Sequence, residues 1–218
     1  MVAMGSEKTR VTIGLSKQKR LPSLKFLGCS YAPWKFASVV RASREWNIQE
    51  TRRGEFSVSR FGKVLTLPRD NLGVLLGEWE EWKKTYLPSF ALTGKVVLDV
   101  GAGAGETALL FFIHGARKVI AVECNEHAIR LLRLNATKNN WDLEVVPGSF
   151  KPEHLQLGVD FLKMDCEGCE ELLSHMGSLP PCRIEVHSTK ARKMLETQFG
   201  LKVLRYGFSQ DIVSIMGN

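Results

Sequence analysis

The sequence predicts an α/β fold built around a mostly parallel sheet, and three observations lead to this prediction. From residue 95 onward, short apolar runs alternate with segments of helical periodicity, which is the order of parallel strands joined by helices. One apolar run, 96–100, breaks into closely spaced glycines and restarts as a helix. The last two apolar runs are joined by so short a turn that they must pair antiparallel. Counting these apolar runs, we expect seven strands.

Composition limits the class of protein. The chain has 218 residues, of which 44% are hydrophobic, enough for one α/β domain with an extension. No stretch approaches the roughly 20 apolar residues of a membrane span, and the basic N-terminus lacks the apolar region of a secretory signal. Five cysteines, an odd number, are typical of reduced thiols. We therefore expect a cytoplasmic protein.

The positive charge is concentrated in the N-terminal part. Residues 1–63 hold 13 Lys+Arg against 4 Asp+Glu, net +9, whereas residues 64–218 hold 17 against 19, net −2. Residues 1–25 lack periodicity and are expected to be a mobile tail. Residues 26–53 mix aromatic with basic side chains, which fits either an accessory subdomain with buried aromatics or an RNA-binding surface.

Three regions are expected along the chain. Residues 1–54 form a basic, aromatic-containing extension, 55–94 a β-hairpin and a helix, and 95–218 the main domain. The alternation in 55–67 predicts a hairpin turning near Gly62. Asn71 is expected to cap a helix that ends near Tyr86.

The main domain is expected to alternate strands and helices, with Asn125 and Ser188 or Thr189 as helix caps. The expected strands are 96–100, 118–122, 143–146, 160–164, 183–186, 201–206 and 211–216. The expected helices are 105–114, 125–140, 170–176 and 188–199, with a short, weak helix in 150–158.

The glycine loop after the first of these strands suggests a ligand. In the dinucleotide fingerprint G-x-G-x-x-G the third glycine would stand at position 106, where this chain has Glu106. A carboxylate there would repel a pyrophosphate. Here Gly101, Gly103 and Gly105 follow the acid Asp99. A strand-to-helix turn without a ligand is the alternative interpretation.

This acid followed by G-x-G-x-G resembles motif I of the class I S-adenosylmethionine (SAM) methyltransferases. The resemblance implies a Rossmann-like sheet of order 3-2-1-4-5-7-6, with its last strand antiparallel. It also implies that Gly101, Ala102 and Gly103 pass under the methionine part of SAM. Asp99 would hold the loop or the ammonium group.

Two further positions complete the expected cofactor site. Glu123 ends the second strand, 24 residues after Asp99, where an acid accepts hydrogen bonds from ribose hydroxyls. Ser149 and Phe150 follow the third strand, where this fold contacts the adenine. A solvated carboxylate and a plain turn are the respective alternatives.

The end of the fourth strand carries the expected acceptor side. Asp165, Glu167 and Glu170 crowd three carboxylates together, which suggests a general base or a cation site. Asp165 would also contact the cofactor. His187 ends the neighbouring strand and is a candidate base, metal ligand or acceptor contact. No H-x-E-type metal motif is present, so we expect no metal.

The pattern D-x-x-K-x-D-x-E-G-x-E at 160–170 and E-x-H at 185–187 resembles the FkbM-type methyltransferases, over roughly residues 55–217. The resemblance implies SAM-dependent methyl transfer, commonly to a hydroxyl of a sugar or secondary metabolite. Asp165, Glu167 and His187 would then be catalytic, with Lys163 and Glu185 supporting them.

Cys166-x-x-Cys169 has the spacing of a redox pair or of half a zinc site. No second C-x-x-C is present, and we expect two packed thiols.

Three functions remain open at this point: O-methylation of a small molecule or glycan, methylation of RNA bound through 1–54, and non-catalytic binding by a SAM fold.

Overall fold

The computed structural model describes residues 13–14, 23–51, 54–206 and 213–217. The chain divides into two compact units, Met1–Arg60 with Leu67–Trp79, and Phe61–Thr66 with Glu80–Asn218. Most of the tail expected at 1–25 lies outside the described residues.

The first unit contains short antiparallel strands and the first helix. Strand β2 pairs with both β1 and β3, and β4 pairs with β5. The elements are β1 (Ile13–Gly14), β2 (Ser23–Phe26), β3 (Cys29–Tyr31), α1 (Pro33–Ser43), β4 (Asn47–Glu50) and β5 (Phe56–Arg60).

Aromatic side chains of the first unit form its core. Tyr31 and Trp46 are buried, and the rings of Trp46 and Trp79 meet edge to face at 5.1 Å. Such pairs stabilise a core beyond their buried area. The accessory-subdomain interpretation of 26–53 fits these aromatics better than a base-stacking surface does.

Strand β6 (Lys63–Leu67) and helix α2 (Arg69–Thr85) each have residues in both units. β5 and β6 are connected by Phe61 and Gly62, both with positive φ, as a tight two-residue turn requires. Helix α2 begins at Arg69, so the expected cap at Asn71 is wrong. The carbonyl of Pro68 accepts the first helical bond, from the Leu72 N–H at 3.0 Å.

The second unit holds a sheet of order β12-β13-β11-β10-β7-β8-β9. Five adjacent strands, from β11 to β9 in this order, are parallel, which confirms the predicted parallel sheet. β13 pairs antiparallel with β11 and with β12. The strands are β7 (Val96–Val100), β8 (Lys118–Glu123), β9 (Leu143–Pro147), β10 (Phe161–Met164), β11 (Cys182–Val186), β12 (Lys202–Tyr206) and β13 (Val213–Gly217).

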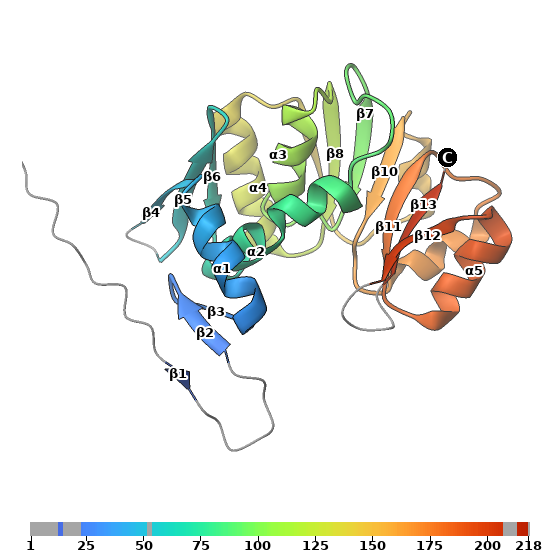
Figure 1. Ribbon diagram of the computed structural model, residues 1–218. Coiled ribbons are helices and arrows are strands. Elements are labelled where there is room, and N and C mark those ends of the chain that lie inside the picture. The colour runs from blue at the N-terminus through green and yellow to red at the C-terminus, as the bar shows by residue number, and fades with distance from the viewer. Residues whose placement is uncertain (1–12, 15–22, 52–53, 207–212, 218) are drawn as a thin grey trace, which may run out of the picture. The chain divides into compact units, whose positions relative to one another are not determined.

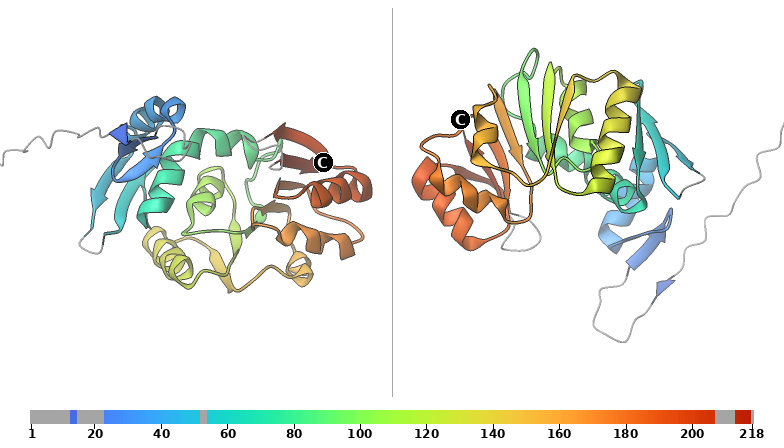
Figure 2. Two further views of the ribbon diagram at one scale, coloured as in Figure 1. Left: turned by 90° about the horizontal axis from the view of Figure 1, so that it is seen from below. Right: turned by 180° about the vertical axis from the view of Figure 1, so that it is seen from behind.

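Helices cover this sheet (Figure 1). α3 and α4 pack against β8, whereas α5 packs against β11 and the 3₁₀ helix η2; Figure 2 shows the same elements from below and from behind. The helices are α3 (Glu106–Ile113), α4 (Glu126–Asn139), η1 (Pro152–Gln156), η2 (Cys169–His175) and α5 (Thr189–Phe199).

Two predicted caps are confirmed. The side chain of Asn125 accepts a hydrogen bond from Ala128 N, and that of Ser188 accepts one from Ala191 N. Among the described residues, no helix combines the length and apolarity needed to cross a membrane.

The sheet reverses direction of growth at β7, since β8 lies on one side of it and β10 on the other. In open α/β sheets, ligands bind beyond the carboxyl ends of the strands at such a switch point. We therefore expect a ligand site at the residues that follow β7 and β10.

Candidate functional site

Four predicted residues stand at the carboxyl ends of parallel strands in the second unit. Asp99 lies in β7, Glu123 ends β8, Asp165 follows β10 and His187 follows β11. Because the strands are parallel, these ends lie along one edge of the sheet. We call the ends of β7 and β8, where the sequence predicts cofactor binding, the cofactor side, and the ends of β10 and β11, where it predicts the acceptor, the acceptor side.

The glycine loop requires Gly101. Its φ is +72°, and an added Cβ would lie 1.8 Å from the backbone oxygen of Asp165. The loops after β7 and β10 therefore approach each other so closely that no side chain fits between them. Gly105, with φ +101°, then begins α3 as its N-cap residue.

Asp99 is completely buried and both of its carboxylate oxygens have partners. Thr107 Oγ1 donates to Oδ2 at 2.5 Å, and Lys163 Nζ lies 3.1 Å from Oδ1. The pairing register places Lys163 opposite Asp99. Of the two predicted roles for Asp99, this geometry favours holding the loop over binding a ligand ammonium.

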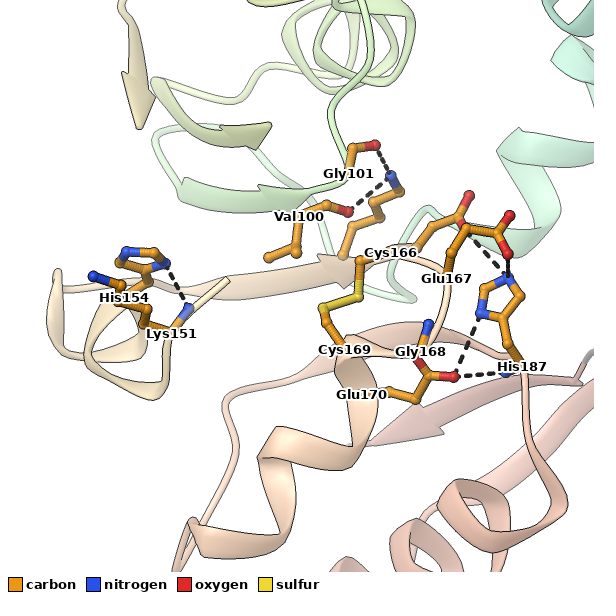
Figure 3. Close-up of a disulfide and its surroundings, with 12 residues drawn as sticks. Val100, Gly101, Lys151, His154, Cys166, Glu167, Gly168, Cys169, Glu170 and His187 are labelled. Atoms are coloured by element: carbon orange, nitrogen blue, oxygen red, sulfur yellow. Dashed lines mark hydrogen bonds and ion pairs between the residues drawn. A yellow bond between two sulfur atoms is a disulfide. The ribbon is translucent and has the colours of Figure 1, made fainter. Parts of the chain in front are cut away.

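Lys163 links β10 to the glycine loop. Its Nζ donates to the carbonyl oxygens of Gly101 at 2.9 Å and Val100 at 3.3 Å (Figure 3). Burial alone would lower the pKa of Lys163, but Asp99, Asp165 and further acids raise it above its ordinary value. A buried, charged lysine thus fixes the loop.

Glu123 is 9% exposed and accepts three backbone hydrogen bonds. Gly103 N–H donates to Oε2 at 2.8 Å, and the N–H groups of Cys124 and Asn125 donate to Oε1. A carboxylate offers about four lone-pair sites, so one is left for a ligand hydroxyl.

The two predicted adenine neighbours differ in environment. Ser149 is exposed, whereas Phe150 is 3% exposed and belongs to the hydrophobic core. The preceding Gly148 donates its N–H to the carbonyl oxygen of Glu123 at 2.8 Å. Their loop therefore starts beside Glu123.

His187 is surrounded by carboxylates on the acceptor side (Figure 3). Its Nε2 lies 3.6 Å from Asp165 Oδ1 and 3.8 Å from Glu167 Oε2. Its Nδ1 lies 3.4 Å from Oε1 of the buried Glu170. The structure thus brings the three predicted catalytic residues, Asp165, Glu167 and His187, together.

The carboxylates keep His187 protonated at neutral pH. The neighbouring carboxylate of Glu170 contributes most and raises the pKa of His187 to about 9, against the opposing effect of burial. Burial would raise the pKa of Glu170, but the His187 imidazole and the hydrogen bond from the His187 backbone N–H lower it overall. An imidazolium has no free lone pair, so His187 is not a base in this state.

Tyr86, which the sequence analysis did not identify as a site residue, joins the two strand ends. Its hydroxyl lies 2.6 Å from Glu185 Oε2 and 3.0 Å from Asp165 Oδ2. Burial, together with these carboxylates, raises the pKa of Tyr86 well above its ordinary value, so it remains a donor. Only its place at the end of a predicted helix could have drawn attention to it.

One group of side chains on the acceptor side could hold a cation. Single ligand atoms of Asp165, Glu185 and His187 all lie within 4.8 Å of one another. Two carboxylates and an imidazole are ordinary ligands for divalent metals.

The two packed thiols expected at 166 and 169 are a disulfide instead. Cys166 and Cys169 are bonded, with their Cα atoms 5.6 Å apart, inside the normal range for such a bond. The positive φ angles of Glu167 and Gly168 turn the chain back so that the two sulfurs meet. Spacing alone could not distinguish this bond from two thiols.

A scan against family models matches residues 84–161 to the ribosomal protein L11 methyltransferase family (PrmA). Among curated proteins, the chain is 36% identical over 83 residues to protein arginine N-methyltransferase 6 of Danio rerio, covering 37% of this chain and 23% of that protein. It is 32% identical over 97 residues to the L11 methyltransferase of Shigella sonnei, covering 44% and 33%. The chain therefore spans a third or less of the length of these two relatives.

Solved structures show a similar fold over more of the chain. M. jannaschii TYW2 in complex with AdoMet aligns with a TM-score of 0.53 at 16% identity, covering 78% of this chain and 87% of that one. P. horikoshii TYW2 in complex with MeSAdo gives 0.51 at 14% identity, covering 84% and 81%. The chain has the α/β Rossmann-like fold of the class I SAM-dependent methyltransferases.

Proposed function

We propose that this chain is a SAM-dependent methyltransferase whose acceptor is a hydroxyl group. The observation that carries the proposal is the close approach of Gly101 and Asp165 at the switch point of the sheet. It brings a cofactor-type loop within van der Waals reach of a strand end rich in carboxylates. A methyl donor and its acceptor need this proximity, since alignment is the main contribution to displacement chemistry.

The proposed cofactor side assigns one task to each group. Gly101, Ala102 and Gly103 lie under the methionine part of SAM, and Asp99 holds the loop through Lys163. The remaining lone pair of Glu123 accepts from a ribose hydroxyl. SAM, when bound there, supplies a methyl group on a positively charged sulfur.

A matching contact is proposed for the adenine. Ser149, which is exposed after β9, offers a hydroxyl to the base, while the buried Phe150 supports this loop from the core side.

The proposed acceptor side handles one proton. Asp165, which is about a third exposed, takes the proton from the acceptor hydroxyl as the oxygen receives the methyl group. His187, protonated by its carboxylate neighbours, donates a hydrogen bond that orients Asp165 or the acceptor oxygen. Glu167, 88% exposed, contacts the outer part of the acceptor.

The narrower resemblance to FkbM-type enzymes supports a hydroxyl acceptor on a small molecule or glycan. The motif residues Lys163, Asp165, Glu170 and His187 make mutual or backbone contacts near the carboxyl ends of the strands. Asp160 accepts from the Val96 N–H at the amino ends of β10 and β7. The pairing of β12, β13 and β11 supports the seven-strand order 3-2-1-4-5-7-6 and its antiparallel last strand. A cytoplasmic location stays a prediction.

RNA is the second candidate acceptor, favoured by the charge of the N-terminal part. Arg41 and Arg44 are exposed on and just after α1, and residues 1–63 carry net +9. Basic side chains of this kind neutralise phosphates. Tyr31 and Trp46, however, are buried and supply no stacking surface.

Transfer of a radiolabelled methyl group from SAM tests the proposal. Total RNA, total protein and a small-metabolite fraction are offered as acceptors, and label in the metabolite fraction is expected. Asp165→Asn should abolish this label, whereas Glu153→Gln, which changes an exposed acid on η1, should not.

Two results would redirect the assignment. Label in RNA, with binding that weakens steeply as salt rises, would favour the second candidate. If calorimetry detects binding of neither SAM nor its demethylated product, the assignment as a methyltransferase is contradicted.

A further inference from the structure

The Cys166–Cys169 disulfide lies between the two halves of the acceptor side. Cys166 directly follows Asp165, and Cys169 directly precedes Glu170. Asp165 packs against Gly101 and accepts a hydrogen bond from the hydroxyl of Tyr86. The bond therefore joins the segment that touches the glycine loop to the segment that holds His187 (Figure 3).

The enclosed residues adopt a conformation that a free chain disfavours. Glu167 has φ +52° and Gly168 has φ +108°. A left-handed conformation costs a non-glycine residue roughly 1 kcal/mol. Closing a short ring removes alternatives that the open chain would otherwise populate, so the disulfide favours this conformation of Glu167.

Two hydrogen bonds depend on the same loop. Glu170 accepts from the N–H groups of Gly168 at 2.9 Å and His187 at 2.7 Å. The carboxylate of Glu170 can serve both donors only while Gly168 stays turned back above it. Opening the loop therefore weakens the hydrogen bond between Glu170 and the His187 N–H. It also moves the Glu167 carboxylate away from the His187 ring.

The disulfide lies at the border between core and solvent. Cys166 and Cys169 are half-buried and pack against the hydrophobic core on one side, whereas Glu167 and Gly168 between them are exposed. Such C-x-x-C pairs exchange with dithiols through a mixed disulfide. The three remaining cysteines, Cys29, Cys124 and Cys182, carry thiols that are not disulfide-bonded.

We propose that Cys166–Cys169 is a reversible thiol–disulfide exchange site that controls the acceptor side and leaves the cofactor side intact. A dithiol is the reductant. One of its thiolates attacks a sulfur of the pair and breaks the S–S bond, and its second thiol then closes to release the reductant as a disulfide. Two electrons and two protons pass to the protein, giving two thiols. The effect on methyl transfer rests on the proposed function, whereas the exchange itself does not.

The first test counts thiols in the full chain. Alkylation after denaturation, followed by intact mass, should detect three thiols before and five after treatment with dithiothreitol, because three of the five cysteines lie outside the disulfide. A Cys124→Ser control should lower both counts by one. Five thiols in protein that was purified without reductant and kept under air would overturn the proposal.

The second test follows amide hydrogen exchange in the loop. Reduction should speed exchange at Gly168 and His187 by about tenfold, because it releases a locally ordered turn. A Cys166→Ser, Cys169→Ser double variant should show the fast rate with or without reductant. Equal rates in the oxidised and reduced wild type would contradict control of the acceptor side.

The third test separates this proposal from the proposed function. SAM affinity measured by calorimetry should agree within about twofold between the two redox states, because Glu123 lies outside the ring and Lys163, not the disulfide, holds the carbonyl groups of the glycine loop. A larger change would contradict an intact cofactor side. Failure to bind SAM in either state would remove the methyltransferase assignment, while thiol counts and exchange rates would still decide the redox site.

Discussion

The two sides of the strand-end edge are built in opposite ways. On the cofactor side, Asp99 and Lys163 are 0% and 1% exposed and satisfy each other, and Glu123 is held by backbone N–H groups. On the acceptor side, Asp165 and Glu167 are 32% and 88% exposed and lie beside other acids. The charged groups of the cofactor side have partners within the protein, whereas the acceptor side retains negative charges that a bound partner would balance.

This difference has an energetic meaning. Buried groups with fixed partners cost much free energy to disturb, whereas exposed charges contribute little to stability. Substitutions on the cofactor side should therefore damage the fold and cofactor binding together. Substitutions on the acceptor side should act mainly on the reaction.

Gly101→Ala should have the largest effect. The new Cβ would overlap the Asp165 backbone oxygen at 1.8 Å, and neither loop can move without breaking the bonds of Lys163. We expect a loss of more than about 4 kcal/mol in unfolding free energy and no measurable SAM binding, by denaturant titration and calorimetry.

Gly148→Ala is the matched control, because it also has positive φ but no atom within 4 Å of the added Cβ. It should cost only about 1–2 kcal/mol. Equal losses in the two variants would contradict the close approach of the two loops.

Lys163→Met should destabilise next most. It leaves the carboxylate of Asp99 buried without its cation, and breaking such a pair costs about 3–5 kcal/mol. Adding Asp99→Asn should restore part of the loss, measured as a double-mutant cycle in urea. Additive losses would contradict direct pairing.

The protonation of His187 should make stability depend on pH. Its folded pKa is about 9, raised from the ordinary value of 6.5, so its contribution is fully present below about pH 6.5 and disappears as pH rises through 9. We expect a loss of roughly 3 kcal/mol across this window.

His187→Asn should flatten the dependence, because it removes the titrating ring. The measurement is urea unfolding at several pH values between 6 and 10. A wild-type profile with the same slope as that of His187→Asn would contradict the raised pKa.

Tyr86→Phe should affect the reaction more than the fold. It removes the hydroxyl that bridges Asp165 and Glu185, and loss of one such bond costs about 1–3 kcal/mol. Acceptor turnover should fall by about 10- to 100-fold with SAM affinity nearly unchanged. Tyr31→Phe, in the other unit, should leave turnover as it is.

Glu167→Gln should have the smallest effect on stability, below about 0.5 kcal/mol, since its side chain is almost fully exposed. If Glu167 contacts the acceptor, the Michaelis constant for the acceptor should rise while SAM affinity stays constant. An unchanged Michaelis constant would remove Glu167 from the site.

The same contrast explains what the sequence could predict. Motif spacing depends on backbone geometry, so the glycine loop, the position of Glu123 and the parallel strands were predictable from local patterns. The ion pair between Asp99 and Lys163 depends on the register of β7 against β10, and a single sequence does not reveal strand register. Tyr86 reaches the site from a helix end 79 residues before Asp165, and no local pattern connects them.

Local chemistry was harder to predict where two outcomes share one pattern. Cys166-x-x-Cys169 fits packed thiols as well as a disulfide, and only the backbone turn at Glu167 and Gly168 distinguishes them. Likewise, Asn71 is of a residue type that often caps helices. Helix α2 nevertheless begins earlier, because the Pro68 carbonyl already accepts a helical hydrogen bond from the Leu72 N–H.

Calorimetric titration of SAM into the full chain and into Glu123→Ala tests the central claim most directly. The claim requires saturable one-site binding to the wild type and at least about tenfold weaker binding to the variant, since Glu123 both orders Gly103 and accepts from the ligand. Absence of binding to the folded wild type, or equal affinity for both proteins, would contradict a cofactor site at the ends of β7 and β8.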